Sequence, residues 1–299
     1  MKIIKPLAIT DAMLTSSTVA ETDYAAWNGA TAYVIGDKVI RVSTHRIYER
    51  LTNGTTATAP ELDSTNWLDI SPTNRWAMFD NVVGTSTTVA SPLTIVLTPG
   101  AVSGIGLLEL VGRTVQITMR DAPAGTVVYD RTISLDGSLI GSVFEWFFEE
   151  YEQLTSVVLT DLPNHFNSCE VTITITASSG NASCGVCKIG DVINIGSLRS
   201  GARVSIIDFS PKTTDTFGNT VIVERAYSKR ASFDVVTTPT IFNRIFRRLA
   251  ELRATPALYI GSENAGYETL VVYGFYKDFS IDVAYQSHHL CTLEVEGLI

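Results

Sequence analysis

The run AWNGATAYVIGDKV, residues 26–39, together with STNWLDI, residues 64–70, decides how this chain begins to fold. A Gly36-Asp37 pair separates two short apolar stretches, which predicts a strand at 33–35, a turn, and a strand at 38–42. A segment this short buries little apolar area, so large aromatic side chains must supply most of its core. The aromatics of that size are Trp27, Tyr33, Tyr48 and Trp67.

The order of these aromatics resembles the small chitin-binding type of carbohydrate-binding module, over residues 26–70. That pattern is Ala-Trp, then Tyr, then Gly-Asp-x-Val, then Tyr and a closing Trp. Members that bind sugar follow the central tyrosine with an exposed pair of aromatics, whereas Glu49 and Arg50 follow Tyr48 here. We therefore expect the four rings to form a core and the module to act as an adaptor. The alternative is that Trp27, Tyr33, Tyr48 and Trp67 bind a carbohydrate.

Composition limits the remaining possibilities. The chain has 299 residues, 45% hydrophobic and 18% charged, which favours two or three folded domains and excludes disorder. Its net charge of −9 argues against a basic nucleic-acid binder. No stretch has the roughly 18 consecutive apolar residues of a membrane span, and residues 1–13 lack the apolar core of a signal peptide. We expect synthesis in the cytoplasm and reduced cysteines.

The order of β-rich runs predicts a mainly β protein with antiparallel β-sandwiches. We expect an extended N-terminal arm at 1–25, the small module at 26–72, a sandwich at 73–194 and a further β domain at 195–299. Predicted strands include the runs at 93–97, 111–119, 126–135, 156–159 and 169–177. The phrases NRWAMFDN (74–81), LLELVGRTVQITMRD (107–121), GTVVYDRTISL (125–135) and VTITIT (171–176) resemble galactose-binding-like jelly rolls.

An aromatic run, FEWFFEEYEQL at 144–154, interrupts the predicted sandwich. We expect it to cap the sandwich core as a bulky loop, and the alternative is a partner surface.

One amphipathic helix is predicted at 239–253, in the C-terminal domain. Thr238 suits a capping position and Pro239 the first turn. Apolar residues recur at helical spacing, and these are Ile241, Phe242, Ile245, Phe246, Leu249 and Leu252. The opposite face is basic and carries Arg244, Arg247, Arg248 and Arg253. We interpret this face as solvated, with docking on an acidic neighbour or another copy of the chain as the alternative.

Four C-terminal phrases resemble the carboxy-terminal domains of tail proteins from long-tailed bacteriophages. They are DFSPKTTDTFGN (208–219), VERAYSKRASFDV (223–235), LAELRATPALYIG (249–261) and YGFYKDFSID (273–282). With the two earlier resemblances, this layout implies a structural subunit of a phage tail tip or baseplate in the virion. The implied partners are other tail proteins, copies of the same chain in a homo-oligomer or ring, and a bacterial surface glycan. The alternative function is a glycan-binding adhesin.

An enzyme is not expected, because His45, His165, His288 and His289 stand in no catalytic phrase. The acids at 149, 150 and 152 are adjacent on one loop and do not define a glycosidase pair. We expect no cofactor.

The spacing of Cys184 and Cys187 is that of many metal sites, and Cys169 and Cys291 would complete a set of four. In a regular strand, two residues three apart point to opposite faces, so a metal would need a bulge at Gly185. If 169–176 and 182–189 form a hairpin, neither Cys184 nor Cys187 lies opposite Cys169. We therefore interpret the four cysteines as core thiols, with a metal site as the alternative.

Overall fold

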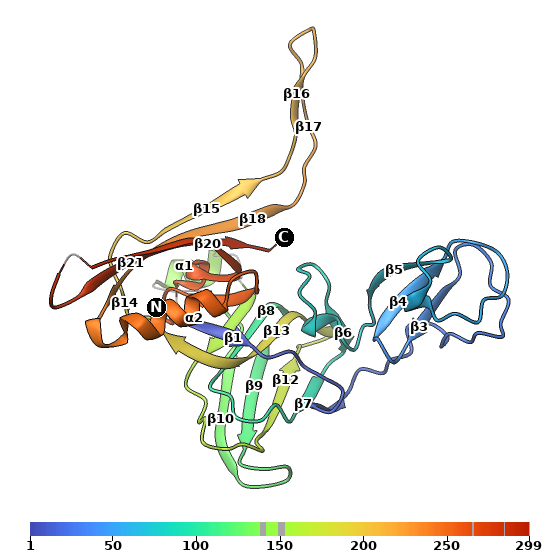
Figure 1. Ribbon diagram of the computed structural model, residues 1–299, viewed down its shortest axis with the longest axis horizontal. Helices are drawn as coiled ribbons and strands as arrows, with labels where there is room; N and C mark the ends of the chain where they lie inside the picture. The colour runs from blue at the N-terminus through green and yellow to red at the C-terminus, as the bar shows by residue number, and fades with distance from the viewer. Residues whose placement is uncertain (138–141, 149–152, 265, 284, 299) are drawn as a thin grey trace.

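The computed structural model describes residues 1–137, 142–148, 153–264, 266–283 and 285–298. The chain is mainly β, as predicted, and its sheets are antiparallel. Figure 1 shows a central β body from which the small N-terminal module and a long hairpin project. Within these ranges, no helix combines the length and the apolar content needed to cross a bilayer.

A β-sandwich forms one half of the body. Its first sheet has the order β10 (Val127–Ser134), β9 (Thr114–Arg120), β12 (Glu170–Thr176), β7 (Leu93–Leu97) and β2 (Leu14–Ser17). The facing strands are β11 (Ser156–Leu159), β8 (Gly104–Val111), β13 (Asn181–Asn194) and β6 (Thr87–Ala90). Strict alternation drives this packing, because β9 buries Val115, Ile117 and Met119 while the residues between them are more exposed. A short 3₁₀ turn, η2 (Ala77–Phe79), adds Met78 to the same core.

The predicted strands at 93–97 and 156–159 are confirmed to the residue. A hairpin between 169–176 and 182–189 is not formed, because β12 and β13 lie in different sheets. Both segments have an apolar face, and those faces meet across the sandwich core. The chain turns at Gly180, whose φ of +75° favours glycine, and crosses from one sheet to the other.

The first strand joins the two halves of the body. β1 (Lys2–Pro6) pairs with β13 on one side and with β19 (Ala257–Ile260) on the other, which makes one continuous 11-stranded sheet. Ile3 and Ile4 are fully buried in separate apolar clusters. Residues 1–25 are therefore not a free arm. They are extended, but β1 is an interior strand and β2 closes the edge of the sandwich.

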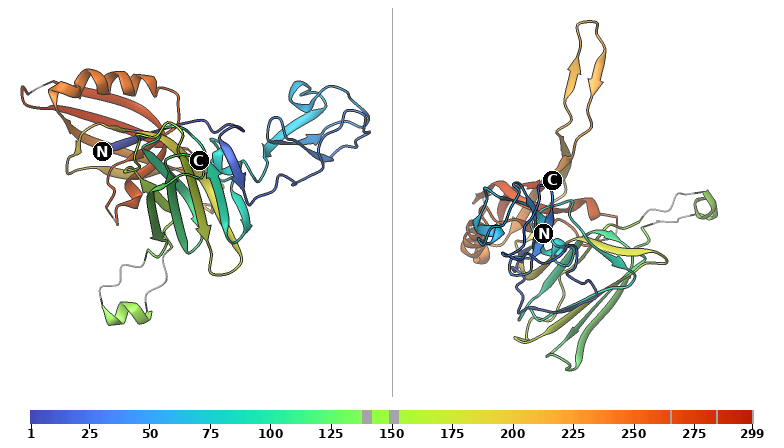
Figure 2. Two further views of the ribbon diagram at one scale, coloured as in Figure 1. Left: turned by 90° about the horizontal axis from the view of Figure 1, so that it is seen from below. Right: turned by 90° about the vertical axis from the view of Figure 1, so that its right-hand side faces the viewer.

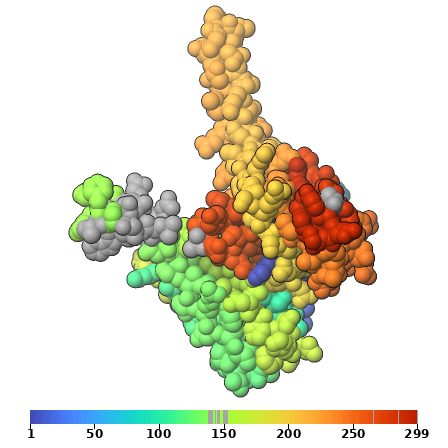
Figure 3. All heavy atoms as spheres, turned by 90° about the vertical axis from the view of Figure 1, so that its left-hand side faces the viewer, coloured from blue at the N-terminus to red at the C-terminus, as the bar shows by residue number. Residues whose placement is uncertain are grey.

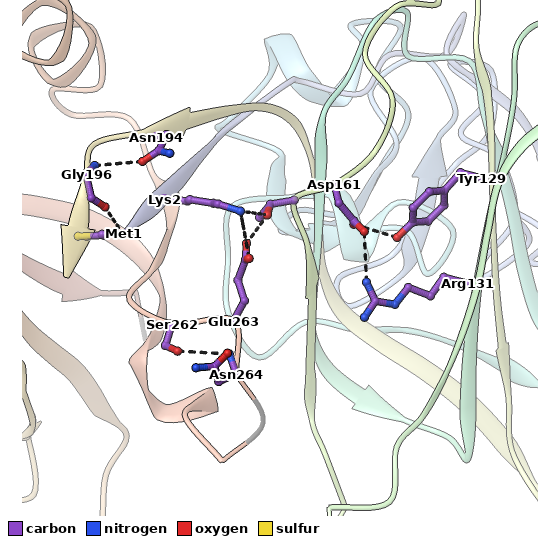
Figure 4. Close-up of polar contacts among 11 residues, drawn as sticks. Met1, Lys2, Tyr129, Arg131, Asp161, Asn194, Gly196, Ser262, Glu263 and Asn264 are labelled. Atoms are coloured by element: carbon purple, nitrogen blue, oxygen red, sulfur yellow. Dashed lines mark hydrogen bonds and ion pairs between the residues drawn. The ribbon is translucent and has the colours of Figure 1, made fainter. Parts of the chain in front are cut away.

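Polar contacts fix β1 at this seam (Figure 4). The Met1 ammonium donates to the Gly196 carbonyl at 2.5 Å, and Lys2 Nζ donates to Thr160 Oγ1 at 2.6 Å and to Glu263 at 2.9 Å. The Thr160 hydroxyl also donates to Glu263. Burial alone would raise the pKa of Glu263, but the hydrogen bonds from Thr160 and Lys2 outweigh it and lower that pKa.

The C-terminal half continues the long sheet. Its strands follow β19 in the order β20 (Val271–Asp282), β21 (His289–Gly297), β18 (Tyr227–Thr237) and β14 (Ser197–Leu198), and β15 (Arg203–Asp208) also pairs with β18. A 3₁₀ turn, η4 (Glu268–Leu270), precedes β20.

The predicted C-terminal helix is confirmed as η3 (Pro239–Ile241) followed by α2 (Phe242–Glu251), and it packs on the sheet (Figure 2). Ile245, Leu249 and Leu252 are buried as the spacing predicts. Phe246 is half exposed and touches the edge of Phe279. Thr238 occupies the N-cap position and Pro239 the first turn, as predicted, but that turn is 3₁₀ and the Thr238 side chain makes no capping hydrogen bond.

A long hairpin leaves the body between β15 and β18. It contains β16 (Lys212–Thr214) and β17 (Thr220–Ile222), which pair with each other. Figures 1 and 3 show that this hairpin stands clear of the rest of the molecule.

Candidate functional site

The small module is a three-stranded sheet around an aromatic core. Its strands are β3 (Lys38–Arg41), β4 (Arg46–Arg50) and β5 (Trp67–Pro72), with a 3₁₀ turn at η1 (Pro60–Leu62). Tyr33, Tyr48 and Trp67 are buried around Val39, and Trp27 is half-buried against them. The rings of Tyr33 and Trp67 meet edge to face with centroids 5.1 Å apart. The four aromatics thus come together as predicted, and they do so as a core.

Guanidinium groups cover both tryptophans. Arg50, only 2% exposed, lies 4.9 Å above the Trp67 ring, and its Nε donates to the Thr52 carbonyl at 2.6 Å. Arg41 lies 4.9 Å above Trp27 and donates to Glu61 at 2.6 Å. The Arg41 hydrogen bond lowers the pKa of Glu61. A sugar stacking on either of these ring faces would have to displace a bound arginine.

Sequence reasoning missed the role of Arg50. It follows Tyr48, where the sugar-binding members of the module family that this pattern resembles have an exposed aromatic pair, so the sequence alone predicts only the loss of a sugar platform. Its guanidinium instead completes the core. Its hydrogen-bond partners, Thr52 and Gly54, follow it directly in the sequence, but the ring that covers it, Trp67, comes from the neighbouring strand β5, and that pairing has no local signal in the sequence.

The predicted strand at 33–35 is a tight turn instead. Asp37 N–H donates to the Val34 carbonyl at 3.0 Å, and Asp37 Oδ2 accepts from Val34 N–H at 2.8 Å. Gly36 has a φ of +92°, which permits the turn. Tyr33 forms an isolated bridge with Gly54. The turn leaves Val34 and Ile35 exposed, and the second half of the predicted hairpin, β3, pairs with β4 and forms a parallel bridge between Ile40 and Ala26.

The outer surface of the module is aliphatic, not aromatic. Its exposed large apolar residues are Val34, Ile35, Val42, Leu51, Leu62, Leu68 and Ile70. Residues 26–72 are all described, and none of their aromatic rings is exposed. Exposed aliphatic side chains are suited to protein contacts, whereas sugar rings stack on aromatic faces.

A polar clamp joins the module to the body. The His45 ring stacks on Trp76 at 4.0 Å, with Nδ1 3.0 Å from Glu21 and Nε2 2.9 Å from Asp11. The Thr73 hydroxyl donates to Glu21 at 2.9 Å, and the Thr73 N–H donates to the His45 carbonyl at 2.9 Å. Both ring nitrogens of His45 are therefore engaged at the junction, which is a structural use of this histidine.

The basic face of α2 borders a groove. Arg244, Arg247, Arg248 and Arg253 are all exposed, as the helical spacing predicts. Arg244 and Arg248 line a groove of about 530 Å³ beside β1 and β13, together with Lys5 and Asp191. Arg247 and Arg253 do not line it.

Part of this basic charge is neutralised within the chain. Arg248 and Lys5 both contact Glu251, at 3.2 and 3.3 Å. Hydrogen bonds from Lys5 and Arg248 lower the pKa of Glu251. The groove therefore keeps Arg244 as its basic residue without an ion pair among the described residues.

Strand β13 is distorted at Gly185, between the two cysteines that are three residues apart. Glu109, opposite Gly185, has a φ of +53°, and a Cβ on Gly185 would lie 2.7 Å from the Glu109 Cβ. Cys184 and Cys187 both lie in the sandwich core, while Val186 between them belongs to a different cluster. The expectation that the two cysteines point to opposite faces is therefore wrong.

The four cysteines do not meet as one set. Cys169, Cys184 and Cys187 lie in the sandwich core, whereas Cys291 lies beneath α2. All four are free and buried. Burial raises the pKa of Cys187 to about 12 and that of Cys291 to about 11. In the part of the chain that the structure describes, no three Cys, His, Asp or Glu side chains form a group suited to a metal.

The aromatic run at 144–154 is not a cap within its described part. α1 (Val143–Phe148) stands off the sandwich, and Phe144, Phe147 and Phe148 are exposed (Figure 2). The rings of Phe144 and Phe148 lie 4.6 Å apart. Residues 149–152, which include the three adjacent acids, lie outside the described residues.

Compared with known proteins, the chain matches no protein family, no curated protein and no solved structure. The evidence for function is therefore the geometry described above, together with the resemblances in the sequence.

Proposed function

We propose that this chain is a structural subunit of the tail tip or baseplate of a long-tailed bacteriophage, which assembles with other tail proteins and contributes to host attachment. Two kinds of evidence support the proposal. The first is the resemblance of four C-terminal segments to the terminal domains of phage tail proteins. The second is the shape of the molecule.

The observation that carries the proposal is the division between one continuous body and its projections. The 11-stranded sheet ties the sandwich to the C-terminal half through β1. From this body project the small module and the hairpin between β15 and β18 (Figures 1 and 2). A rigid body with projecting elements suits a building block that contacts several neighbours at once.

The small module supports an adaptor role more than a glycan-binding adhesin. Its three buried rings and the arginines over Trp27 and Trp67 leave no exposed aromatic platform. Its exposed side chains are aliphatic. Weak sugar binding by other residues would gain strength from repetition in an assembly. A glycan-binding adhesin is therefore the alternative function.

Immuno-electron microscopy tests the proposal directly. Intact particles of the phage that encodes the chain are labelled with an antibody raised against the purified chain. We expect label at the distal end of the tail, and pre-immune serum from the same animal is the control. Intact particles without label, with a positive immunoblot of the infected cells, would refute the structural role and make a glycan array with the isolated chain the next measurement.

A further inference from the structure

His45 lies at the joint between the small module and the body. It ends the turn between β3 and β4, and its φ of +55° is in the left-handed region, which histidine enters more readily than most side chains do. Its ring contacts segments outside the module's sheet. Glu21 belongs to the segment that enters the module, Trp76 to the segment that leaves it, and Asp11 to the turn between β1 and β2 of the body.

Both ring nitrogens of His45 face a carboxylate. Nδ1 lies 3.0 Å from Glu21, and Nε2 lies 2.9 Å from Asp11. An ionised carboxylate only accepts hydrogen bonds, and a neutral imidazole has one N–H and one bare nitrogen, so only the imidazolium donates to both. The Trp76 ring is stacked on His45 with centroids 4.0 Å apart and provides a face that attracts a cation. The geometry therefore fits the protonated ring.

The two carboxylates differ in how firmly they are held. The Glu21 side chain is 9% exposed and accepts from the Thr73 hydroxyl as well. The Asp11 side chain is 72% exposed, and its one ion pair in the described part of the chain is with His45. A buried carboxylate that loses a donor is costly, whereas an exposed one turns to water. A ring with a single proton therefore keeps the bond to Glu21 and releases Asp11.

The other charged groups at the joint are engaged elsewhere. Arg46 and Asp80 line a hollow of about 400 Å³ beside the His45 ring. Arg46 pairs with Asp69 at 2.7 Å, and Asp80 accepts from the Thr85 hydroxyl at 3.1 Å. Burial raises the pKa of Asp80. The hollow admits water to the joint, so the ring can exchange its proton while the protein stays folded.

We propose that the polar clamp of His45, Asp11, Glu21 and Trp76 is a proton-dependent joint that fixes the orientation of the small module. In the protonated form, the ring holds both carboxylates and ties the module to the body. As the pH rises through the range in which histidine loses its proton, between about pH 5 and pH 8, Nε2 becomes a bare nitrogen opposite Asp11 and that contact is lost. The clamp therefore holds at low pH and releases the module as the pH rises.

Single-molecule energy transfer between two dyes measures the orientation of the module in the purified chain, so the outcome is independent of the tail-tip role. The dyes are attached at Leu62→Cys in the module and Val127→Cys in the sandwich, both exposed sites. The four natural cysteines are buried and take up little dye. We expect one narrow distribution of transfer efficiency at about pH 5 and a broader, shifted distribution at about pH 8. Identical distributions at both pH values overturn the proposal.

Two variants of this labelled chain should abolish the pH response from opposite directions. His45→Gln has no titrating ring and no positive charge, so its distribution should be broad at both pH values. Asp11→Asn places an amide opposite Nε2, which can accept from a protonated nitrogen and donate to a bare one, so its distribution should stay narrow at both. Circular dichroism checks that each variant is folded, and Asp11→Asn keeps the test decisive if His45→Gln does not fold.

His165→Gln is the matched control, because His165 is exposed and makes none of the contacts of the clamp. It should respond to pH like the wild-type chain. A His45→Gln variant that responds like wild type, or an Asp11→Asn variant that is already broad at about pH 5, overturns the assignment of the response to the His45 ring.

Discussion

At the level of single residues, the small module is stabilised by contacts between charged and aromatic side chains. Arg50 is buried above Trp67, and the bonds from Arg50 to the Thr52 and Gly54 carbonyls fix the loop that follows β4. A buried guanidinium is costly unless its donors are satisfied and its face is covered. Trp67 covers that face, so the ring contributes both apolar area and a partner for the charge.

Replacing Trp67 by alanine should unfold the module while the body stays folded. The loss is about 3–5 kcal/mol for a buried Trp, and a segment of this size has little stability to spare, at roughly 0.05–0.15 kcal/mol per residue. Near-ultraviolet circular dichroism and proteolysis within residues 26–72 would report the unfolding. Leu62→Ala, at an exposed site of the same module, should leave both signals unchanged. A folded Trp67→Ala module that loses binding to a glycan would identify Trp67 as a binding residue.

The cysteines should be unreactive in the native protein. Burial raises the pKa of Cys187 to about 12, that of Cys291 to about 11, and those of Cys169 and Cys184 above the ordinary range. At pH 8 the thiolate fraction of Cys187 or Cys291 is roughly a thousandth or less, and the thiolate is the reactive form. A colorimetric thiol reagent should therefore label four cysteines in guanidinium and almost none in buffer.

The raised pKa values of the four thiols also determine how the free energy of unfolding changes with pH. Unfolded thiols ionise near pH 8.5 to 9, whereas the folded ones resist ionisation until a higher pH. Their contribution to stability is therefore complete below about pH 8 and decreases as the pH rises toward the folded values. Rapid labelling of the native chain at pH 8 would contradict the burial on which both expectations depend.

At the level of elements, α2 combines an apolar stripe that fixes it to the sheet with a basic face that remains exposed. Ile245 and Leu249 hold the helix on the C-terminal core. Arg244 and Arg248 stand one turn apart at the groove beside β1. Because the stabilising residues and the charged residues are different, the basic face can be changed without unfolding the helix.

Reversing the charge at two positions tests whether this face takes part in assembly. Arg244→Glu combined with Arg248→Glu should leave the circular dichroism spectrum unchanged and reduce self-association or particle yield if the helix docks on an acidic surface. Arg199→Glu combined with Lys277→Glu makes the same change in net charge at other exposed positions and is the control. Equal assembly of both double variants would show that the face of α2 is only solvated.

At the level of the whole molecule, β1 is the element on which both halves of the body depend. Five residues pair with β13 and three with β19, so the first strand closes the sandwich sheet and the C-terminal sheet at once. Ile3 and Ile4 serve two separate apolar clusters. The body should therefore unfold as one cooperative unit, with the small module as a separate one.

Removal of residues 1–6 should destabilise the sandwich and the C-terminal half together. It exposes the facing edges of β13 and β19 and removes two fully buried isoleucines, a loss of several kcal/mol. Scanning calorimetry should show one main transition for the body, shifted down by the truncation, beside a smaller transition for the module. Two body transitions, of which the truncation shifts only one, would contradict a shared dependence on β1.

Local sequence patterns predict the mainly β fold, the aromatic core of the small module, and the position and faces of the C-terminal helix. These features depend on local periodicity, turn residues and side-chain size, all of which are present in the sequence itself. The predicted strands at 93–97 and 156–159 are confirmed for the same reason. Interface residues on β surfaces have little local signature, so the sequence does not identify the faces that meet a neighbour.

Which distant segments meet depends on long-range strand pairing, which becomes visible in the folded protein. β1 looked like an arm because its interior position depends on β13 and β19, nearly 190 and 255 residues further along the chain. The strand after Gly180 crosses to the opposite sheet, a choice between pairings that alternation alone leaves open. The burial of Arg50 against Trp67 on the neighbouring strand and the shared core of Cys184 and Cys187 depend on such strand pairings, which local sequence patterns do not encode.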